Sequence, residues 1–344
     1  MEQHLLSPGP LLDENGNLFE VGYAYSLVKK YNREDIRVSK WRIKEWDYYY
    51  IGNSEKAIAL TIADNGYMDL ASVSMFDLIN KTMHEESVMD AFSFGKLNLP
   101  RTSGEGITQY INKKKDVEMR FSHENGKRHI YCRWPKFQNG LDLRIDVFLE
   151  ESSQNSMVIA TPWNKKGHFY YNQKINNLVA TGYAKLGEEY IDLSRDTLGV
   201  LDWGRGVWTY KNTWYWSSLN AIQDGHKIGW NLGYGFGNNT RATENMLFID
   251  DRVYKLDTVR FEIPMDKKGN PLYGDDWRIT SPSGEIDLIF TPKIVRCGGA
   301  NALIINSKQR QVFGTFTGVF RLDNGETVEI NDLTGFAEKV YNRW

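Results

Sequence analysis

Strand-like segments separated by tight-turn signals are the feature that most constrains the fold of this chain. Residues 56–76 (KAIALTIADNGYMDLASVSMF) place Asn65–Gly66 between two apolar stretches, and Asn-Gly pairs favour the positive φ angles of a tight hairpin. A second turn of this kind, Asn324–Gly325, lies near the C-terminus. Residues 141–150 (LDLRIDVFLE) alternate apolar and polar side chains with the period of a half-buried strand. Many short strands joined in this way predict an antiparallel sandwich or barrel rather than βαβ units.

Helical patterns are scarce, and the length of the chain bounds the number of domains. Residues 74–92 mix the helical and the strand period, which leaves a short helix possible there. A chain of 344 residues has room for about two domains. Because the charged content rises over residues 183–199, we place a boundary in that segment and predict two β domains, 1–193 and 194–344.

Charge balance and missing motifs exclude several classes of protein. The 42 basic and 44 acidic residues give a net charge of −2, whereas a protein that binds nucleic acid has a basic excess or stripe. No uninterrupted apolar run reaches the length of a membrane span. The sequence lacks phosphate-loop, dinucleotide, zinc-protease and serine-hydrolase signatures, and Cys132 and Cys297 have no metal-type spacing. We therefore expect no nucleic acid, no membrane span, no metal and no cofactor.

The compartment follows from the N-terminus and the cysteines. The N-terminal segment has neither the basic region nor the apolar region of a signal peptide. Two lone cysteines suit a reducing compartment. We predict a cytoplasmic protein, and the sequence leaves its oligomeric state open.

Residues 200–220 (VLDWGRGVWTYKNTWYWSSLN) hold the main candidate for a site. In a strand, alternate residues share a face. One face then carries a carboxylate, two glycines and two rings: Asp202, Gly204, Gly206, Trp208 and Tyr210. The opposite face carries Trp203 and Arg205, and a following strand puts Trp214, Trp216 and Asn220 together. Because glycines leave space beside the carboxylate, we predict a ring-lined pocket for a small organic ligand or a sugar. The alternative is an aromatic core in which Asp202 pairs with Arg205.

Two further groups supply candidate acids and bases. Glu244 and Asn245 precede an apolar strand, and Glu244 is a candidate partner for Asp202 in acid/base work. The alternative for Glu244 is a surface turn residue. His168, Tyr170 and Lys174 stand at even intervals, so one strand face can hold all three. A lone histidine is more often a hydrogen-bonded filler than a catalyst.

Several segments resemble a known family. The runs LLDENGNLFEVGYA, FYYNQK, LVATG, LDWGRGVWTYKNTWYWSS and ATENMLF are similar to the bacterial domain of unknown function 2804 family, from about Leu11 to the C-terminus. That family looks distantly related to the hydroxyneurosporene-synthase-like proteins, which include carotenoid 1,2-hydratases. The resemblance implies an all-β, calycin-like chain of two antiparallel lipocalin-like barrel or sandwich domains packed together. It also implies that Asp202 holds the place of an aspartate that protonates an alkene. Trp203 departs from the histidine or arginine that follows that aspartate.

These observations lead to one leading function and two alternatives. We predict a cofactor-independent acid/base enzyme of hydratase, lyase or isomerase type, with Asp202 as the acid and Glu244 or His168 as the base. The predicted ligand-binding residues are Arg205, Trp203, Trp208, Tyr210, Trp214, Trp216, Asn220, Tyr170, Lys174 and Asn245. The alternatives are a glycoside hydrolase with a carboxylate pair and a non-catalytic lipocalin-like binding protein.

Overall fold

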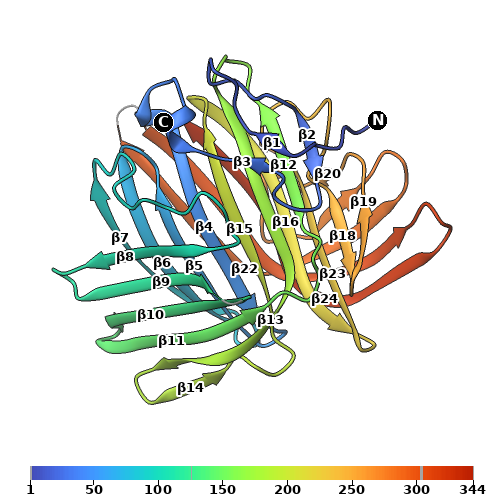
Figure 1. Ribbon diagram of the computed structural model, residues 1–344. Helices are drawn as coiled ribbons and strands as arrows, with labels where there is room; N and C mark the ends of the chain where they lie inside the picture. Colours follow the sequence, from blue (N-terminus) through green and yellow to red (C-terminus); the bar gives the residue numbers. More distant parts are fainter. Residues whose placement is uncertain (1, 125, 303–304, 344) are drawn as a thin grey trace.

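Two antiparallel sheets make up almost the whole protein. The computed structural model describes residues 2–124, 126–302 and 305–343. Within these residues the helical elements are two single 3-10 turns, η1 (Arg33–Asp35) and η2 (Lys40–Arg42). A short parallel pair, β1 (Gly9–Pro10) and β3 (Lys29–Lys30), lies apart from both sheets. The prediction of an all-β chain with two antiparallel units packed together is confirmed (Figure 1).

The first sheet has 13 strands. Its main path runs in the order β7 (Thr82–Ala91), β6 (Met68–Asp77), β5 (Lys56–Asp64), β4 (Ile43–Gly52), β15 (Leu198–Val207), β13 (Phe169–Leu186), β11 (Leu141–Glu150), β10 (Lys127–Gln138), β9 (Val117–Glu124) and β8 (Gly106–Asn112). Off this path, β12 (Met157–Pro162) joins β13 to β2 (Gly22–Ala24), and β14 (Glu189–Asp192) pairs with the end of β13. Strands β8–β11 run across the direction of β4–β7, so the sheet is strongly curled (Figure 1).

The second sheet has nine strands. Their order is β19 (Arg252–Lys255), β18 (Met246–Ile249), β17 (His226–Tyr234), β16 (Lys211–Gln223), β24 (Thr327–Arg343), β23 (Ile305–Arg321), β22 (Ile286–Ala302), β21 (Trp277–Thr280) and β20 (Arg260–Glu262). The chain passes from the first sheet to the second between β15 and β16, that is, between Val207 and Lys211. The domain division at 193/194 stays a prediction.

Most of the predicted turns and strands occur as expected. Gly66 has a φ of 79° in the turn between β5 and β6, and Gly325 has a φ of 84° between β23 and β24. Residues 141–150 coincide with β11, and its alternate apolar side chains are buried. Residues 74–92 contain no helix, because residues 82–91 pair with β6 along their whole length as an edge strand. The possibility of a short helix there is therefore wrong.

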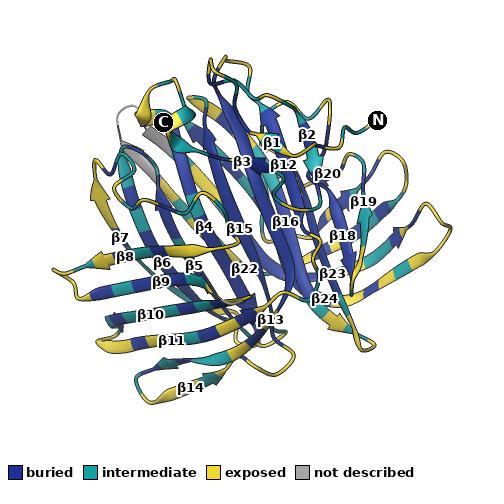
Figure 2. Cartoon of the chain, viewed as in Figure 1, coloured by how far each residue is buried: buried dark blue, intermediate teal, exposed yellow. Residues whose placement is uncertain are grey.

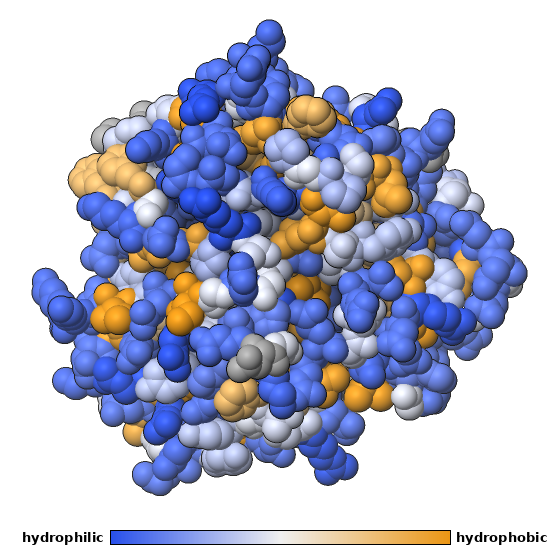
Figure 3. All heavy atoms as spheres, viewed as in Figure 1, coloured by the Kyte–Doolittle hydropathy of each residue, from blue (hydrophilic) through white to orange (hydrophobic). Residues whose placement is uncertain are grey.

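Aromatic side chains join the two sheets. Tyr50 of β4 stacks on Phe313 of β23 with ring centroids 5.5 Å apart, and Phe76 of β6 lies 4.1 Å from the same ring. The buried part of the molecule is concentrated along β4, β13, β15 and β16, where the sheets meet (Figure 2). On the face drawn in Figure 3, apolar side chains form only small patches among polar ones. The large apolar groups are thus used mainly inside and between the sheets.

Strand β13 carries an irregularity that sits against the second sheet. Its pairing with β15 shifts between Ile175 and Leu178, and Asn177 has a φ of 58°. The side-chain oxygen of Asn220 accepts hydrogen bonds from the Asn176 side chain at 3.0 Å and from the Asn177 backbone at 2.7 Å. Asn220, predicted as a ligand contact, therefore holds this bulge in place.

Candidate functional site

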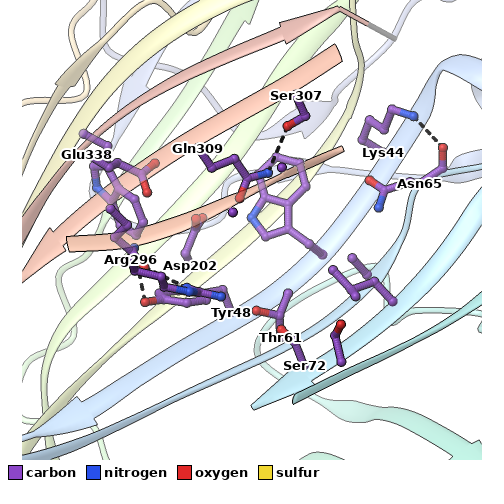
Figure 4. A pocket seen from close by; sticks show the side chains of 18 of the residues that line it. Lys44, Tyr48, Thr61, Asn65, Ser72, Asp202, Arg296, Ser307, Gln309 and Glu338 are labelled. Atoms are coloured by element: carbon purple, nitrogen blue, oxygen red, sulfur yellow. Dashed lines mark hydrogen bonds between the residues drawn. The ribbon is translucent and has the colours of Figure 1, made fainter. Parts of the chain in front are cut away.

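A cavity of about 590 Å³ lies between the two sheets. One wall comes from strands β4–β7 with β13 and β15, and the other comes from β16 and β22–β24 (Figure 4). This volume is in the range of pockets that enclose small organic ligands. The cavity is lined by the predicted catalytic residue Asp202 and by four of the predicted ligand contacts, Lys174, Trp208, Trp214 and Trp216.

A row of polar side chains crosses the first wall. Lys174 pairs in register with Asp202, and Asp202 pairs in register with Tyr48. From Tyr48 the register pairing continues across the sheet to Thr61 on β5, then to Ser72 on β6 and to Ser87 on β7. Side chains of directly opposed residues point to the same side of a sheet. All six line the cavity, so six strands present one continuous polar row to it.

A second row crosses the facing wall. Arg296, Gln311, Glu338 and Trp216 are register partners on β22, β23, β24 and β16. The second row contacts the first wall at two points: Gln311 Nε2 donates to the Tyr48 hydroxyl at 3.4 Å, and Arg296 Nε donates to a carboxylate oxygen of Glu85 on β7 at 2.5 Å. These two contacts form a polar seam between the sheets.

Asp202 forms a buried ion pair that faces the cavity. Its carboxylate lies 2.8 Å from Lys174 Nζ, and the two side chains are 9% and 1% exposed. Asn172 Nδ2 donates to the other carboxylate oxygen at 2.6 Å. The Lys174 ammonium group also lies 3.8 Å from the centroid of the Trp216 ring. Both carboxylate oxygens of Asp202 therefore have a partner that donates to them, and one of these partners is a cation. The alternative of a pair with Arg205 does not occur.

Glu338 is a second cavity carboxyl group, with a different environment. Burial raises its pKa to about 7, and the charge of Asp202 acts in the same direction. A hydrogen bond of 2.7 Å from Trp214 Nε1 and the charge of Lys174 act in the opposite direction. Because this pKa is close to neutral, Glu338 holds a proton part of the time at pH 7 and is able to release it. The site therefore combines an ion-paired carboxylate with a carboxyl group poised for proton transfer.

Rings form the apolar part of the wall. Trp208 lies at their centre, with ring centroids 5.6 Å from Trp46 and 5.2 Å from Trp214. Phe236 continues the series at 5.4 Å from Trp214. Such clusters offer flat apolar surfaces to a ligand. Trp208, Trp214 and Trp216 all lie at the cavity surface, and their role as ligand contacts stays a prediction.

The glycines beside Asp202 do not leave space for a ligand. A side chain at Gly204 would overlap the indole of Trp46, and one at Gly206 would lie 2.5 Å from the backbone oxygen of Phe169. The prediction that they clear room for a ligand is wrong, because Trp46 of β4 fills the space beside Gly204 and the Phe169 backbone of β13 fills the space beside Gly206. Gly204 instead lets the Trp46 ring lie flat on β15 and form part of the cavity wall.

Arg205 and Trp203 lie on the opposite face of β15, within the first sheet's own core. Arg205 is fully buried, and its guanidinium group contacts Asp47 at 3.0 Å and lies 4.3 Å from the Trp203 ring centroid. Neither residue lines the cavity. Tyr210 lies beyond the end of β15 and is 42% exposed. These three residues are not brought to the cavity.

The two candidate bases lie behind the wall. Glu244 is fully buried next to the Tyr170 hydroxyl, at 3.5 Å, and burial raises its pKa to about 8. It is therefore not a surface turn residue. His168 is buried too, with Nδ1 3.1 Å from the Trp208 backbone oxygen, and burial lowers its pKa. Neither Glu244, Tyr170 nor His168 lines the cavity.

Asn245 has a structural role in this region. Its side-chain oxygen accepts from the Gly233 backbone at 2.7 Å, and its Nδ2 donates to the Asp257 backbone oxygen at 2.7 Å. Both bonds tie the segment before β18 to its neighbours. Asn245 does not line the cavity.

Sequence reasoning missed most of the wall that the first sheet and the C-terminal strands supply. The missed cavity residues with the clearest chemistry are Trp46, Tyr48, Glu85, Arg296, Gln311 and Glu338. One signal was available: in residues 43–52 (IKEWDYYYIG), period two puts Trp46 and Tyr48 on one face. Another was a carboxylate between apolar positions of a strand, since Phe336, Glu338 and Val340 alternate inward on β24. What brings these residues to Asp202 is the packing of two sheets, which strand periodicity does not encode.

Across residues 2–124, 126–302 and 305–343, no group of three or more His, Cys, Asp or Glu residues is arranged to hold a metal ion. The same residues include no helix of the length and apolarity needed to cross a membrane.

Comparison with known proteins gives distant similarities and one family. A protein of Nitrosomonas europaea described as AttH has a TM-score of 0.49 at 12% identity, covering 90% of this chain and 96% of the other. Kievitone hydratase of Nectria haematococca gives 0.47 at 13% identity, with 88% of each chain covered. CghA with Sch210972 gives 0.48 at 10% identity, with 97% of each chain covered. No curated protein matches the sequence. Residues 2–344 match the domain of unknown function family DUF2804, and the chain belongs to this family.

Proposed function

We propose that the protein is an enzyme of hydro-lyase or isomerase type that moves protons on a small organic molecule held in the cavity between the sheets. One observation carries the proposal: a carboxyl group with a pKa of about 7, Glu338, and an ion-paired carboxylate, Asp202, line the same cavity. A proton donor and a proton acceptor at one ligand are what general acid/base catalysis needs.

The environments of the two groups assign their roles. Asp202 is ion-paired with Lys174 and accepts a hydrogen bond from Asn172, so we assign it the role of the group that takes the proton from carbon. Glu338 gives its proton to the atom that gains one, for instance a leaving hydroxyl group that departs as water. The sequence led us to predict Asp202 as the acid. The proposal reverses that role, because the prediction did not include the ion pair between Asp202 and Lys174. Trp208 and Trp214 hold the apolar part of the ligand.

Incorporation of deuterium from solvent tests the proposal without knowledge of the natural substrate. The protein is incubated in D2O with a panel of unsaturated alcohols and cyclic enones, and deuterium gain is followed by mass spectrometry. We expect catalysed exchange into at least one member of the panel. Glu338→Gln keeps the hydrogen-bond acceptor for Trp214 but loses the proton, so exchange should fall by about 10²–10⁴-fold. A compound that binds in the cavity without any exchange would instead support a binding protein.

Glycoside hydrolysis is the second candidate, because Asp202 and Glu338 come from opposite walls of one cavity. Glycosidases place two carboxyl groups on either side of the scissile bond. A panel of aryl glycosides tests this candidate through release of the phenol. Release that depends on both Asp202 and Glu338, with no exchange into the unsaturated panel, would replace the first proposal by the second.

A further inference from the structure

Three hydroxyl groups on the cavity wall have no hydrogen-bond partner in the part of the chain that the structure describes. They belong to Thr61, Ser72 and Ser87, which are register partners on β5, β6 and β7. Among the described residues none of the three side chains has a hydrogen bond. Ser72 is only 4% exposed, yet it lines the cavity. None of the three hydroxyl oxygens is a buried atom without a partner, so all three open to the cavity. A hydroxyl group both donates and accepts, so a row of them that makes no bond within the protein offers those bonds to a ligand in the cavity.

The row has a defined spacing and direction. Neighbouring strands lie about 4.8 Å apart, so the polar row from Tyr48 to Ser87 extends over about 14 Å. Figure 4 shows Thr61 and Ser72 side by side on adjacent strands, with Asp202 and Tyr48 at one end of the series. The proposed proton-transfer groups therefore stand at one end of the row, and the hydroxyl groups lead away from them.

An apolar row runs beside the hydroxyl row. Trp46, Ala63, Leu70 and Met89 are register partners on the same four strands and also line the cavity. They lie two residues along each strand from the polar row, which is about 7 Å. The floor of the cavity thus has a polar edge and an apolar edge that run in parallel.

We propose that the ligand is an elongated, rigid, polyoxygenated molecule with an apolar body, whose oxygen substituents along one edge bind Thr61, Ser72 and Ser87. Its body lies on the apolar row, and its reacting end meets Asp202 and Glu338. A simple acyl chain fits this wall poorly, because it would displace water from the hydroxyl groups and replace none of their hydrogen bonds. The inference rests on the proposed function only in taking this cavity as the ligand site.

A series of bile acids supplies matched probes. 5β-Cholanate, lithocholate, deoxycholate and cholate share one skeleton and one carboxylate, and they carry zero, one, two and three hydroxyl groups along one face. Binding to the full-length protein is measured by calorimetry below the micelle concentration. We expect cholate to bind about tenfold more tightly than lithocholate. An apolar cavity gives the reverse order, since 5β-cholanate is the most hydrophobic of the four. That reverse order, or no binding by any of the four, would overturn the proposal.

Variants connect the ranking to the row. Ser72→Ala should reduce the preference for cholate, and Thr61→Val with Ser72→Ala and Ser87→Ala should abolish it. Thr82→Val is the matched control, because Thr82 lies on β7 but is exposed and does not line the cavity. If the triple variant folds and still prefers cholate, the row is not the binding edge. If the triple variant fails to fold, the order in which the wild-type protein binds the four bile acids decides whether the proposed ligand class is right.

The two proposals fail separately. Glu338→Gln removes a proton but none of the three hydroxyl groups, so it should keep the cholate preference while solvent exchange falls. A protein with the preference but no exchange would refute the catalytic role and keep the ligand class. A protein that catalyses exchange but does not prefer cholate would refute the ligand class and keep the catalytic role.

Discussion

Two buried ion pairs leave strand β15 on opposite faces, and they differ in what surrounds them. Arg205 and Asp47 are enclosed: the guanidinium group also donates to the backbone oxygens of Trp46, Gly204 and Pro100 at 2.8–2.9 Å. Asp202 and Lys174 border the cavity, and their other contacts are the side-chain amide of Asn172 and the ring of Trp216.

The difference separates a structural pair from a functional one. Arg205 is fully buried, its terminal guanidinium nitrogens donate to Asp47 and to backbone oxygens, and neither member of the pair lines the cavity. Asp202 retains access to the cavity, where water or a ligand can approach it. Burial and charge alone, which both pairs share, would have favoured neither as the site.

The largest expected effect is the loss of the enclosed pair. Arg205→Ala leaves Asp47 buried without its cation, and we expect the free energy of unfolding to fall by about 4 kcal/mol. Urea unfolding measures this value. Arg144→Ala is the control, because Arg144 is 57% exposed and lies 3.7 Å from Asp146; its loss should cost less than about 0.5 kcal/mol. A loss below about 1 kcal/mol for Arg205→Ala would contradict the structural role.

The next effect concerns packing on the cavity face. Gly204→Ala places a methyl group where the Trp46 indole lies, and the overlap should cost about 3 kcal/mol. Gly274→Ala meets no heavy atom within 4 Å and should be close to neutral. Thermal unfolding compares the two variants. Equal stability for both would mean that Trp46 moves aside freely, and the cavity wall would then be adaptable.

The two aspartates allow a direct contrast. Asp47→Asn strands the Arg205 charge in a closed core, whereas Asp202→Asn leaves Lys174 beside a cavity that admits water. We expect the first substitution to lower the free energy of unfolding by about 2 kcal/mol more than the second. Both are measured under the same urea conditions. Asp202→Asn should have the larger effect on the deuterium exchange with solvent. The opposite ranking in either assay would mean that Asp47 and Arg205 form the functional pair and Asp202 and Lys174 the structural one.

A smaller effect is the pH dependence of stability from buried carboxyl groups. Burial raises the pKa of Glu244 from 4.5 to about 8 in the folded protein. The unfolded chain therefore releases this proton at lower pH, and stability present below about pH 4.5 is lost as pH rises through 8. We expect a decline of about 1 kcal/mol per pH unit in this window. Unfolding at pH 5 to 8 should show a shallower decline for Glu244→Gln, and an unchanged slope would contradict the raised pKa.

Local sequence signals determined the secondary structure and part of one wall. The Asn-Gly turns and the period-two pattern of residues 141–150 found their strands, since both depend on nearest neighbours. The segment 74–92 was ambiguous, because its pairing with β6 decides its conformation and its own pattern does not. Within residues 200–220, the alternation of a strand predicted that Asp202 and Arg205 point to opposite faces, and in the structure they do.

By itself, then, the sequence determined an all-β chain and marked Asp202, Lys174 and three tryptophans as neighbours of one pocket. Only the tertiary structure decided what those residues do. Arg296 and Glu338, which also line the cavity, follow Asp202 by more than 90 positions in the sequence. The space beside Gly204 is filled by the Trp46 ring. The physical reason is that strand periodicity fixes which way a side chain points, whereas sheet order and the packing of two sheets fix what it meets there.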